Sequence, residues 1–236
     1  MTEFAKFSVF VTGTDTGVGK TLVSAMLLRA LASRYLRVVG MKPVAAGTAM
    51  HDGAQANDDV LALRAASNLR VAPELDNPFL LTDPVSPHIA AERAGIRIDI
   101  SYIVACHRKL MQLADAVVVE GAGGFMVPLL DDDAESSSGA DLAVALKLPV
   151  LLVVGLRLGC LNHALLTAEA IRSRGLTLAG WVANHVDPGM AAPDRNISFL
   201  ERKLDAPLLA SIAWQTDPDT SKLAMELLAA WLPTGP

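Results

Sequence analysis

The sequence lacks most features that mark secreted or membrane proteins. Its 236 residues include only two cysteines, Cys106 and Cys160, which lie in separate helical patterns and form no C-x-x-C pair. This indicates reduced thiols rather than a disulfide framework. The longest dense apolar stretch, 148–155, is far below the ~20 residues that span a bilayer. The N-terminus contains Glu3 and only a short apolar run, unlike a signal peptide. We therefore expect a cytoplasmic protein with no membrane partner.

Clusters of basic residues are also missing. The formal net charge is -5 and no lysine or arginine cluster is present, so we expect no nucleic-acid partner. The five histidines show no metal-ligand spacing. No linker, repeat or low-complexity region divides the chain, and 52% of the residues are hydrophobic. This composition predicts one large domain, residues 1–236, with a substantial core.

Strand and helix patterns alternate along the whole chain. The predicted strands are 7–12, 36–42, 116–120, 150–155, 178–184 and 208–212, and the predicted helices are 20–33, 58–67, 100–113, 141–147, 161–174, 194–204 and 221–232. Continuous apolar strands separated by helices predict a single-domain α/β fold with a mostly parallel sheet and helices on both faces. We expect residues 47–57 to be a flexible polar segment and 131–138 a solvated, mobile loop. Ligands of such sheets bind beyond the carboxyl ends of the strands.

The segment Val9–Thr21 joins an apolar strand to an Ala/Leu-rich helix through a Gly/Thr-rich turn that ends in Gly-Lys-Thr. This arrangement is typical of a P-loop, in which backbone N–H groups and a helix N-terminus surround a polyphosphate. Lys20 would reach the β- and γ-phosphates, and the Thr21 hydroxyl would bind Mg²⁺. The first glycine of the motif is displaced by one position, to Gly13. The alternative is an ordinary strand–turn–helix connection in which Gly-Lys-Thr is accidental.

Two charged residues end predicted strands. Glu120 comes after Val-Val-Val and before Gly-Ala-Gly-Gly, like the acidic strand end that holds Mg²⁺ in P-loop enzymes. Lys42 ends the second strand, and Pro43 stiffens the chain beyond it. A lysine there would place a cation near the phosphates, where it would stabilise a transferring phosphoryl group. The alternatives are a surface glutamate in a turn and an ordinary solvated lysine.

Other polar residues fit local structural roles, and some of them fit a functional role as well. Asp58 and Asp59 begin a predicted helix, where one would be an N-cap and the other a Mg²⁺ ligand. Asn184 ends a strand, where its amide would read an adenine edge or simply occupy a turn. Ser86 and Pro87 fit the start of a helix, with Ser86 as N-cap.

Several motifs together resemble one family, dethiobiotin synthetase. They are Gly13–Thr21, Lys42-Pro43-Val44, Ser86-Pro87-His88, Glu120–Gly124, Leu158–His163 and Gly180–Asn184. They follow that family's order and spacing over nearly the whole chain. The resemblance also accounts for the displaced glycine, because the family's P-loop has the form Gly-Thr-Asp-Thr.

The resemblance implies a ligase of biotin biosynthesis. Such an enzyme takes 7,8-diaminononanoate, CO₂ and ATP with Mg²⁺ and forms the cyclic urea of dethiobiotin, ADP and phosphate. CO₂ adds to one amine as a carbamate, and the carbamate attacks the γ-phosphate to give a carbamic–phosphoric anhydride. The second amine then displaces phosphate. This chemistry depends on positioning and on an anion clamp more than on a strong base.

The resemblance also implies roles for individual residues. The Mg²⁺ set is Thr21, Asp59 and Glu120, and the catalytic residues are Lys20, Lys42 and Thr16. The nucleotide would contact Gly17, Val18, Gly19, Lys20, Thr21, Leu22, Glu120, Gly121, Ala122, Gly123, Asn184, His185, Ala213, Trp214 and Gln215. The other substrate would contact Asp15, Thr16, Lys42, Ala46, Gly159, Cys160, Leu161 and Asn162. The family is a homodimer in which the diamine lies across the interface, so residues 159–162 would contact substrate bound mainly by the other subunit.

Two residues depart from the family pattern. Gly17 stands where members often have Glu, and Ala46 stands where they often have Ser, so a hydroxyl contact is lost unless Thr48 replaces it. Two alternative functions are a partition-type P-loop ATPase switch and another ligase of the same superfamily. In the switch ATPases the loop reads Lys-Gly-Gly-Val-Gly-Lys-Thr, and Asp15 stands at the position of their first lysine. The related cobyrinate amidotransferases usually carry a glutaminase domain, for which this chain has no room.

Overall fold

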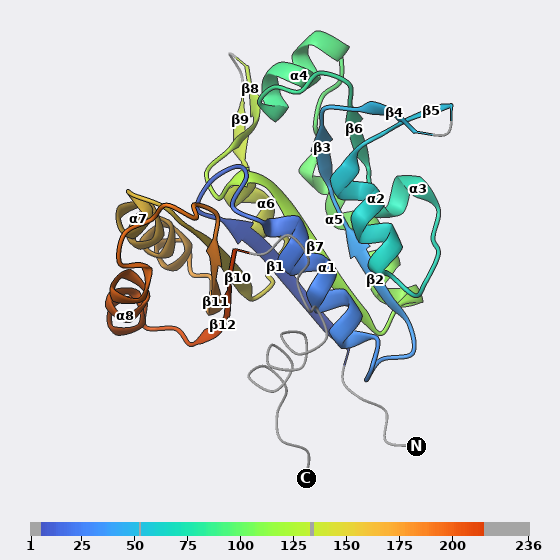
Figure 1. The fold of residues 1–236 in the computed structure, drawn as a ribbon. Coiled ribbons are helices and arrows are strands. Elements are labelled where there is room, and N and C mark those ends of the chain that lie inside the picture. The colour runs from blue at the N-terminus through green and yellow to red at the C-terminus, as the bar shows by residue number, and fades with distance from the viewer. Residues whose placement is uncertain (1–5, 52, 133–134, 215–236) are drawn as a thin grey trace.

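The fold is built around a six-stranded parallel sheet (Figure 1). The computed structural model describes residues 6–51, 53–132 and 135–214. In the order β12-β11-β10-β1-β7-β2, the sheet strands are Leu208–Ile212, Leu178–His185, Val150–Leu156, Phe7–Gly13, Ala116–Gly124 and Val38–Met41. Strand β1 lies between β10 and β7, so the loop that follows β1 begins near the middle of the sheet. The predicted parallel sheet is confirmed.

Helices cover both faces of the sheet, as the alternation of side chains requires. Val118 packs against α1 (Lys20–Leu31) and α2 (Asp58–Ala66). Its neighbours Val117 and Val119 pack on the opposite face, within the cluster that includes α4 (Pro87–Ala94), α5 (Ile100–Leu113), α6 (Gly139–Leu146), α7 (Cys160–Ser173) and α8 (Pro193–Lys203). Successive strand residues point to opposite faces, and each face buries apolar side chains. No helix in the described part of the chain is long and apolar enough to cross a membrane.

Short elements lie beyond the carboxyl ends of the strands. They are β3 (Val44–Ala46), β4 (Ala49–His51), β5 (Ala54–Ala56), β6 (Phe79–Leu81), β8 (Pro128–Asp131) and β9 (Ser136–Ser138). The short helix α3 (Pro73–Asp76) packs against β2 and α5. Strands β3 and β6 pair in parallel, whereas β4–β5 and β8–β9 form antiparallel hairpins. The expectation of loops at 47–57 and 131–138 was therefore wrong in part. The structure places a hairpin in each segment, although both are polar.

Most predicted elements are present with bounds that differ by a few residues. The second strand begins at Val38 because the preceding residues form a turn in which Leu36 is 83% exposed. The N-cap of α2 is Asn57, whose side chain accepts hydrogen bonds from two backbone amides, so neither Asp58 nor Asp59 is the cap. Ser86 is at the N-cap position of α4 but makes no side-chain capping bond. The predicted helix 221–232 lies outside the described residues.

Candidate active site

The loop between β1 and α1 has the backbone conformation of a tight phosphate-binding turn. Gly17 and Gly19 have φ of 73° and 92°, a region that favours glycine. A Cβ at Gly19 would lie 2.1 Å from Nδ2 of Asn184, so a side chain at this position is also excluded by contact. Asn184 donates a hydrogen bond from Nδ2 to the carbonyl oxygen of Val18, at 2.9 Å. Asn184, near the end of β11, therefore anchors the loop through its side-chain amide.

Lys20 lies at the first turn of α1 and is 7% exposed. Its Nζ donates to the carbonyl oxygen of Asp15 at 3.1 Å, within the loop. Burial, followed by the nearby Lys42 ammonium, lowers the pKa of Lys20 to about 8. Two cations that face the same space create a site in which an anion is favourable.

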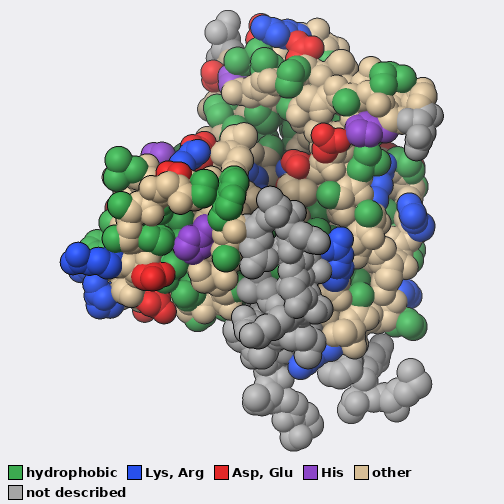
Figure 2. Space-filling model, viewed as in Figure 1, with side chains coloured by type: hydrophobic (Ala, Val, Ile, Leu, Met, Phe, Trp, Pro, Cys, Tyr) green, Lys and Arg blue, Asp and Glu red, His purple; other side chains and the backbone are tan. Residues whose placement is uncertain are grey.

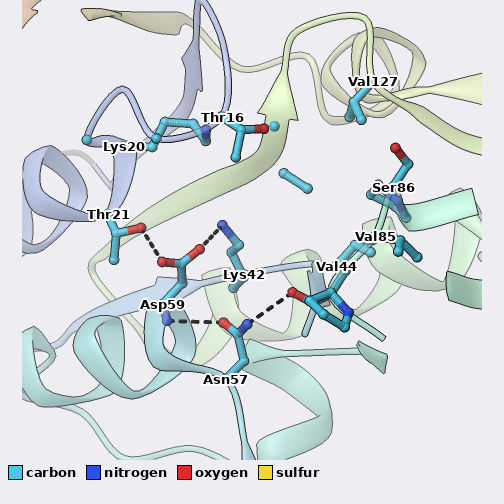
Figure 3. Close-up of a pocket in the computed structure, with 17 residues that line it drawn as sticks. Thr16, Lys20, Thr21, Lys42, Val44, Asn57, Asp59, Val85, Ser86 and Val127 are labelled. Carbon is cyan, nitrogen blue, oxygen red and sulfur yellow. Dashed lines mark hydrogen bonds and ion pairs between the residues drawn. The ribbon is translucent and has the colours of Figure 1, made fainter. Parts of the chain in front are cut away.

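Four side chains meet beside the loop, and three of them, Thr21, Lys42 and Asp59, are labelled in Figure 3. The fourth is Glu120, from β7. The Thr21 hydroxyl lies 2.7 Å from Oδ1 of Asp59 and 2.9 Å from Oε1 of Glu120. Lys42 Nζ lies 2.8 Å from Oδ2 of Asp59 and 2.6 Å from Oε1 of Glu120. Lys42 is 4% exposed and Glu120 is 0% exposed. The alternatives of a surface glutamate and a solvated lysine are thus wrong, because both side chains are buried and paired.

The charges in this cluster are coupled. Burial alone would lower the pKa of Lys42, but the carboxylates of Glu120 and Asp59 outweigh it and raise that pKa. For Asp59, burial acts to raise the pKa, and the Lys42 ammonium and the Thr21 hydroxyl reverse the effect, so the pKa is lowered. Lys42 is therefore a charged ammonium and Asp59 a carboxylate at neutral pH.

The cluster fits Mg²⁺ in its donor chemistry. A hydroxyl and two carboxylates are the hard oxygen ligands that Mg²⁺ prefers, and phosphate oxygens and water complete such sites. Glu120 Oε2 is buried and makes no hydrogen bond, so one carboxylate oxygen is left without a partner. No three His, Cys, Asp or Glu side chains among the described residues gather to form a metal site by themselves. Thr21, Asp59 and Glu120 would thus bind the ion together with a nucleotide.

A cleft of about 700 Å³ opens next to the cluster. In the space-filling view the surface is hollowed between the part that carries α2 and α4 and the part that carries α7 (Figure 2). One side of the cleft is polar and comes from the P-loop and the cluster, and the other side is largely apolar. The polar side includes Thr16, Gly17, Gly19, Lys20, Thr21, Lys42, Asn57, Asp59 and Gly123, and the far side includes Val44, Ala46, Pro84, Val85, Ser86, Pro87, Ala122 and Val127.

Asn57 connects the two sides of this cleft (Figure 3). Its Oδ1 accepts from the backbone N–H groups of Asp59 and Val60, at 3.1 and 3.3 Å. Its Nδ2 donates to the carbonyl oxygen of Gly47 at 2.7 Å. This side chain therefore fixes the first turn of α2, which carries Asp59, against the loop that follows β3.

Several predicted residues lie away from the cleft. The Asp15 carboxylate forms an ion pair with Arg157 and accepts from the Thr16 N–H, so it faces β10 rather than the cleft. Cys160 is 3% exposed and packs in the core, so its side chain contacts no ligand in this arrangement. Its neighbours Gly159, Leu161 and Asn162 form the exposed or half-buried start of α7.

The predicted adenine side is only partly described. Because Nδ2 of Asn184 binds the P-loop, its Oδ1 is the atom that would read an adenine amino group. His185 is half-buried and its Nε2 lies 3.4 Å from the Ser211 hydroxyl. Ala213 and Trp214 are exposed, and Gln215 lies outside the described residues. Leu22 is half-buried in α1, whereas Val18 is buried and offers its backbone.

Sequence reasoning missed part of the site. Pro84, Val127 and Asn57 line the cleft but belong to no recognised phosphate motif. Arg157 was also missed, although it follows a predicted strand, which is the signal used for Lys42 and Glu120. The apolar wall could not be found in this way, because it depends on how residues 44–46 and 84–87 fold toward each other.

Solved structures with a similar fold include a ParA family ATPase and MinD cell division proteins. A ParA family ATPase from Chlorobium tepidum TLS is 13% identical, with 95% of this chain and 91% of that chain covered and a TM-score of 0.55. MinD from Pyrococcus horikoshii OT3, a septum site-determining protein solved with Mg-ADP, is 17% identical, with coverages of 94% and 86% and a TM-score of 0.54. A chain of the MinC:MinD cell division protein complex from Aquifex aeolicus is 16% identical. The match covers 93% of this chain and 85% of that chain, with a TM-score of 0.55. At these identities the likeness establishes the P-loop NTPase fold.

A family model described as an AAA domain matches residues 8–221, which include the P-loop, Lys42, Asp59, Glu120 and Asn184. The match extends from β1 to beyond β12 and so includes the whole parallel sheet. The chain therefore belongs to the AAA_26 family of P-loop NTPase domains.

Proposed function

We propose that this protein uses ATP to carboxylate a diamine and close it to a cyclic urea, with 7,8-diaminononanoate as substrate and dethiobiotin, ADP and phosphate as products. The observation that supports the proposal is the continuity of the cleft. It begins at Lys20 and Thr21, where a nucleotide's phosphates would lie, passes Lys42, and continues along an apolar wall that includes Val44 and Val127. A second substrate with an aliphatic chain fits such a wall.

The buried cluster also suits this reaction. A carbamate and a γ-phosphate are both anions, and their approach needs cations fixed in place before the chemistry begins. Lys42 is held by two carboxylates and so presents its ammonium without conformational freedom. Lys20 would hold the phosphates from the other side, and Thr16 also lines the cleft. Bound Mg²⁺ would neutralise charge on the phosphates and activate the γ-phosphorus toward attack.

The two departures from the family pattern bear on substrate contacts. Gly17 and Ala46 both line the cleft, but neither offers a polar side chain. The Thr48 hydroxyl is buried without a hydrogen-bond partner and is not among the residues that line the cleft. We therefore propose that backbone groups and Ser86 supply polar contacts on that side.

A homodimer is part of the proposal. Leu158 is 97% exposed and directly precedes Gly159 at the start of α7. An apolar side chain so exposed suits contact with a second copy of the chain. The adjacent N-terminus of α7 would favour a carboxylate on the substrate bound by that copy. Residues 159–162 of one subunit would then contact substrate bound mainly by the other.

The test is ADP release from the purified protein with MgATP and bicarbonate, with and without 7,8-diaminononanoate. We expect ADP formation that requires the diamine, together with dethiobiotin detected by mass. Diamine-independent hydrolysis, or no hydrolysis, would overturn the proposal.

A second candidate is a nucleotide-dependent switch of the partition or cell-division type. The observation that favours it is the fold shared with ParA and MinD ATPases. Under this hypothesis the protein would dimerise on ATP and hydrolyse it without a diamine. Asp15 argues against it, because it stands where those loops have a lysine and its carboxylate is paired with Arg157 within the same chain. ATP-dependent dimerisation without diamine-dependent ADP release would favour the switch.

A further inference from the structure

The edge strand β2, which positions Lys42, has unusual support. As the last strand of the sheet it pairs with β7 on one side only, so its other backbone groups need partners elsewhere. The N–H of Val38 donates to Asn68 Oδ1 at 2.6 Å, and the N–H of Gly40 donates to Ser67 Oγ at 2.9 Å. The N–H of Lys42 donates to the carbonyl oxygen of Asp76 at 2.7 Å. The strand therefore rests against the segment that links α2 to β6.

Lys42 is held by this segment on both of its backbone groups. In addition to the bond from its N–H, its carbonyl oxygen accepts a hydrogen bond from Nδ2 of Asn77 at 2.7 Å. Asn77 is 8% exposed and Asp76 is 4% exposed. Both contacts are thus shielded from water. In the protein interior, hydrogen bonds are stronger and constrain geometry more than they do in water.

The segment is in turn fixed to α2 by a two-pronged ion pair. Arg64 Nε lies 2.8 Å from Asp76 Oδ2, and Arg64 Nη2 lies 2.5 Å from Asp76 Oδ1. This geometry adds directional restraint to the charge interaction. The same helix also carries Asp59, which binds the Lys42 ammonium. Helix α2 thus fixes the ammonium of Lys42 through Asp59 and its backbone through Arg64.

We infer that Arg64, Asp76 and Asn77 are positioning residues for Lys42, none of which contacts the cleft's reacting groups. This inference rests on the proposed function only in assigning Lys42 the role of anion clamp. A misplacement of about 1 Å at a reacting group costs on the order of 100-fold in rate. The network is therefore expected to act on turnover rather than on nucleotide affinity.

The test compares Asn77→Leu and Arg64→Gln with Arg37→Gln. The control removes an Arg–Asp pair of the same kind, since Arg37 binds both carboxylate oxygens of Asp115, but the pair lies at the opposite end of β2. Arg64→Lys is included because it keeps a cation beside the buried Asp76 and so folds if Arg64→Gln does not. Readouts are kcat, KM for ATP, and the ¹⁵Nζ signal of Lys42 in lysine-labelled protein, assigned with Lys42→Arg.

We expect Asn77→Leu and Arg64→Gln to lower kcat at least about tenfold, to leave KM for ATP within about twofold, and to shift the Lys42 signal. Arg64→Lys should restore part of kcat, and Arg37→Gln should match the wild type in kcat and in the Lys42 signal. An unchanged Lys42 signal in both network variants would overturn the inference. If the wild-type protein forms no dethiobiotin, the proposed function fails, while the Lys42 signal still decides the positioning role.

Discussion

The ammonium nitrogen of Lys42 lies 2.6 Å from Oε1 of Glu120, and the two side chains are 4% and 0% exposed. Each charge is compensated within the buried cluster, in which Lys42 also binds Asp59. Removing one partner of a buried pair leaves an uncompensated charge, which costs about 3–5 kcal/mol.

Lys42→Met is therefore expected to lower the free energy of unfolding by about 3–5 kcal/mol. Adding Glu120→Gln should recover much of this loss, because the unpaired carboxylate is then gone. Urea unfolding of the two variants and of Glu120→Gln alone measures the coupling. Equal losses in Lys42→Met and in the double variant would contradict the pairing.

Glu120→Gln should lower the apparent affinity for Mg²⁺ in nucleotide binding. The substitution keeps the shape of the side chain but removes a charged oxygen ligand, so the Mg²⁺ midpoint should rise by about tenfold. Titration of a fluorescent ATP analogue over a range of Mg²⁺ concentrations measures this. If the Mg²⁺ midpoint of the variant equals that of the wild type, Glu120 is not one of the Mg²⁺ ligands.

Gly19→Ala should reduce nucleotide affinity far more than Gly17→Ala. Both positions have positive φ, for which an L-residue costs about 1–2 kcal/mol. Only at Gly19 would the added Cβ meet another group, the Asn184 amide, at 2.1 Å, whereas nothing lies within 4 Å of a Cβ at Gly17. Calorimetric titration with MgATP compares the two. Equal losses would show that contact with Asn184 does not matter.

Acid should destabilise the protein through His107. The buried imidazole of His107 has its Nε2 3.0 Å from the Ser8 hydroxyl. Burial, followed by the charge of Arg108, lowers the pKa of His107 from 6.5 to about 4. Between these values the unfolded state binds a proton that the folded state does not. Stability is thus lost as the pH falls from about 6.5 to about 4, by about 3 kcal/mol.

The matched variant for this prediction is His107→Gln, which cannot titrate. Its free energy of unfolding should vary less with pH over the same window, as measured by urea unfolding at several pH values. Identical pH profiles for the variant and the wild type would exclude His107 as the source.

Sequence patterns predicted the central sheet well because its strands are continuous apolar runs. Strand β12 and helix α5 have the predicted bounds, and Lys42 does meet Asp59 and Glu120. The short strands β3 and β6 were not predicted, because three-residue pairs have no periodicity of their own. The N-cap Asn57 was missed because two aspartates follow it and fit the same role.

The cleft's far wall and the support of Lys42 could not be predicted for a different reason. Pro84 and Asn77 act through contacts with residues about 35 or more positions away in the chain, at Lys42 and Gly47. No local spacing encodes such contacts. Patterns at strand ends indicate which side chains reach the edge of the sheet, but not what the loops between them enclose.

The two sides of the cleft come from different stretches of the chain. The loop after β1, the end of β7 and the first turn of α2 lie on the nucleotide side, whereas residues 44–46 and 84–87 form most of the apolar wall. Helix α2 thus belongs to the nucleotide side although it lies between the two wall segments in the chain, so a change of the wall must leave Asp59 and Arg64 in place. Two short stretches can therefore vary in sequence while the helix between them keeps the charge cluster intact.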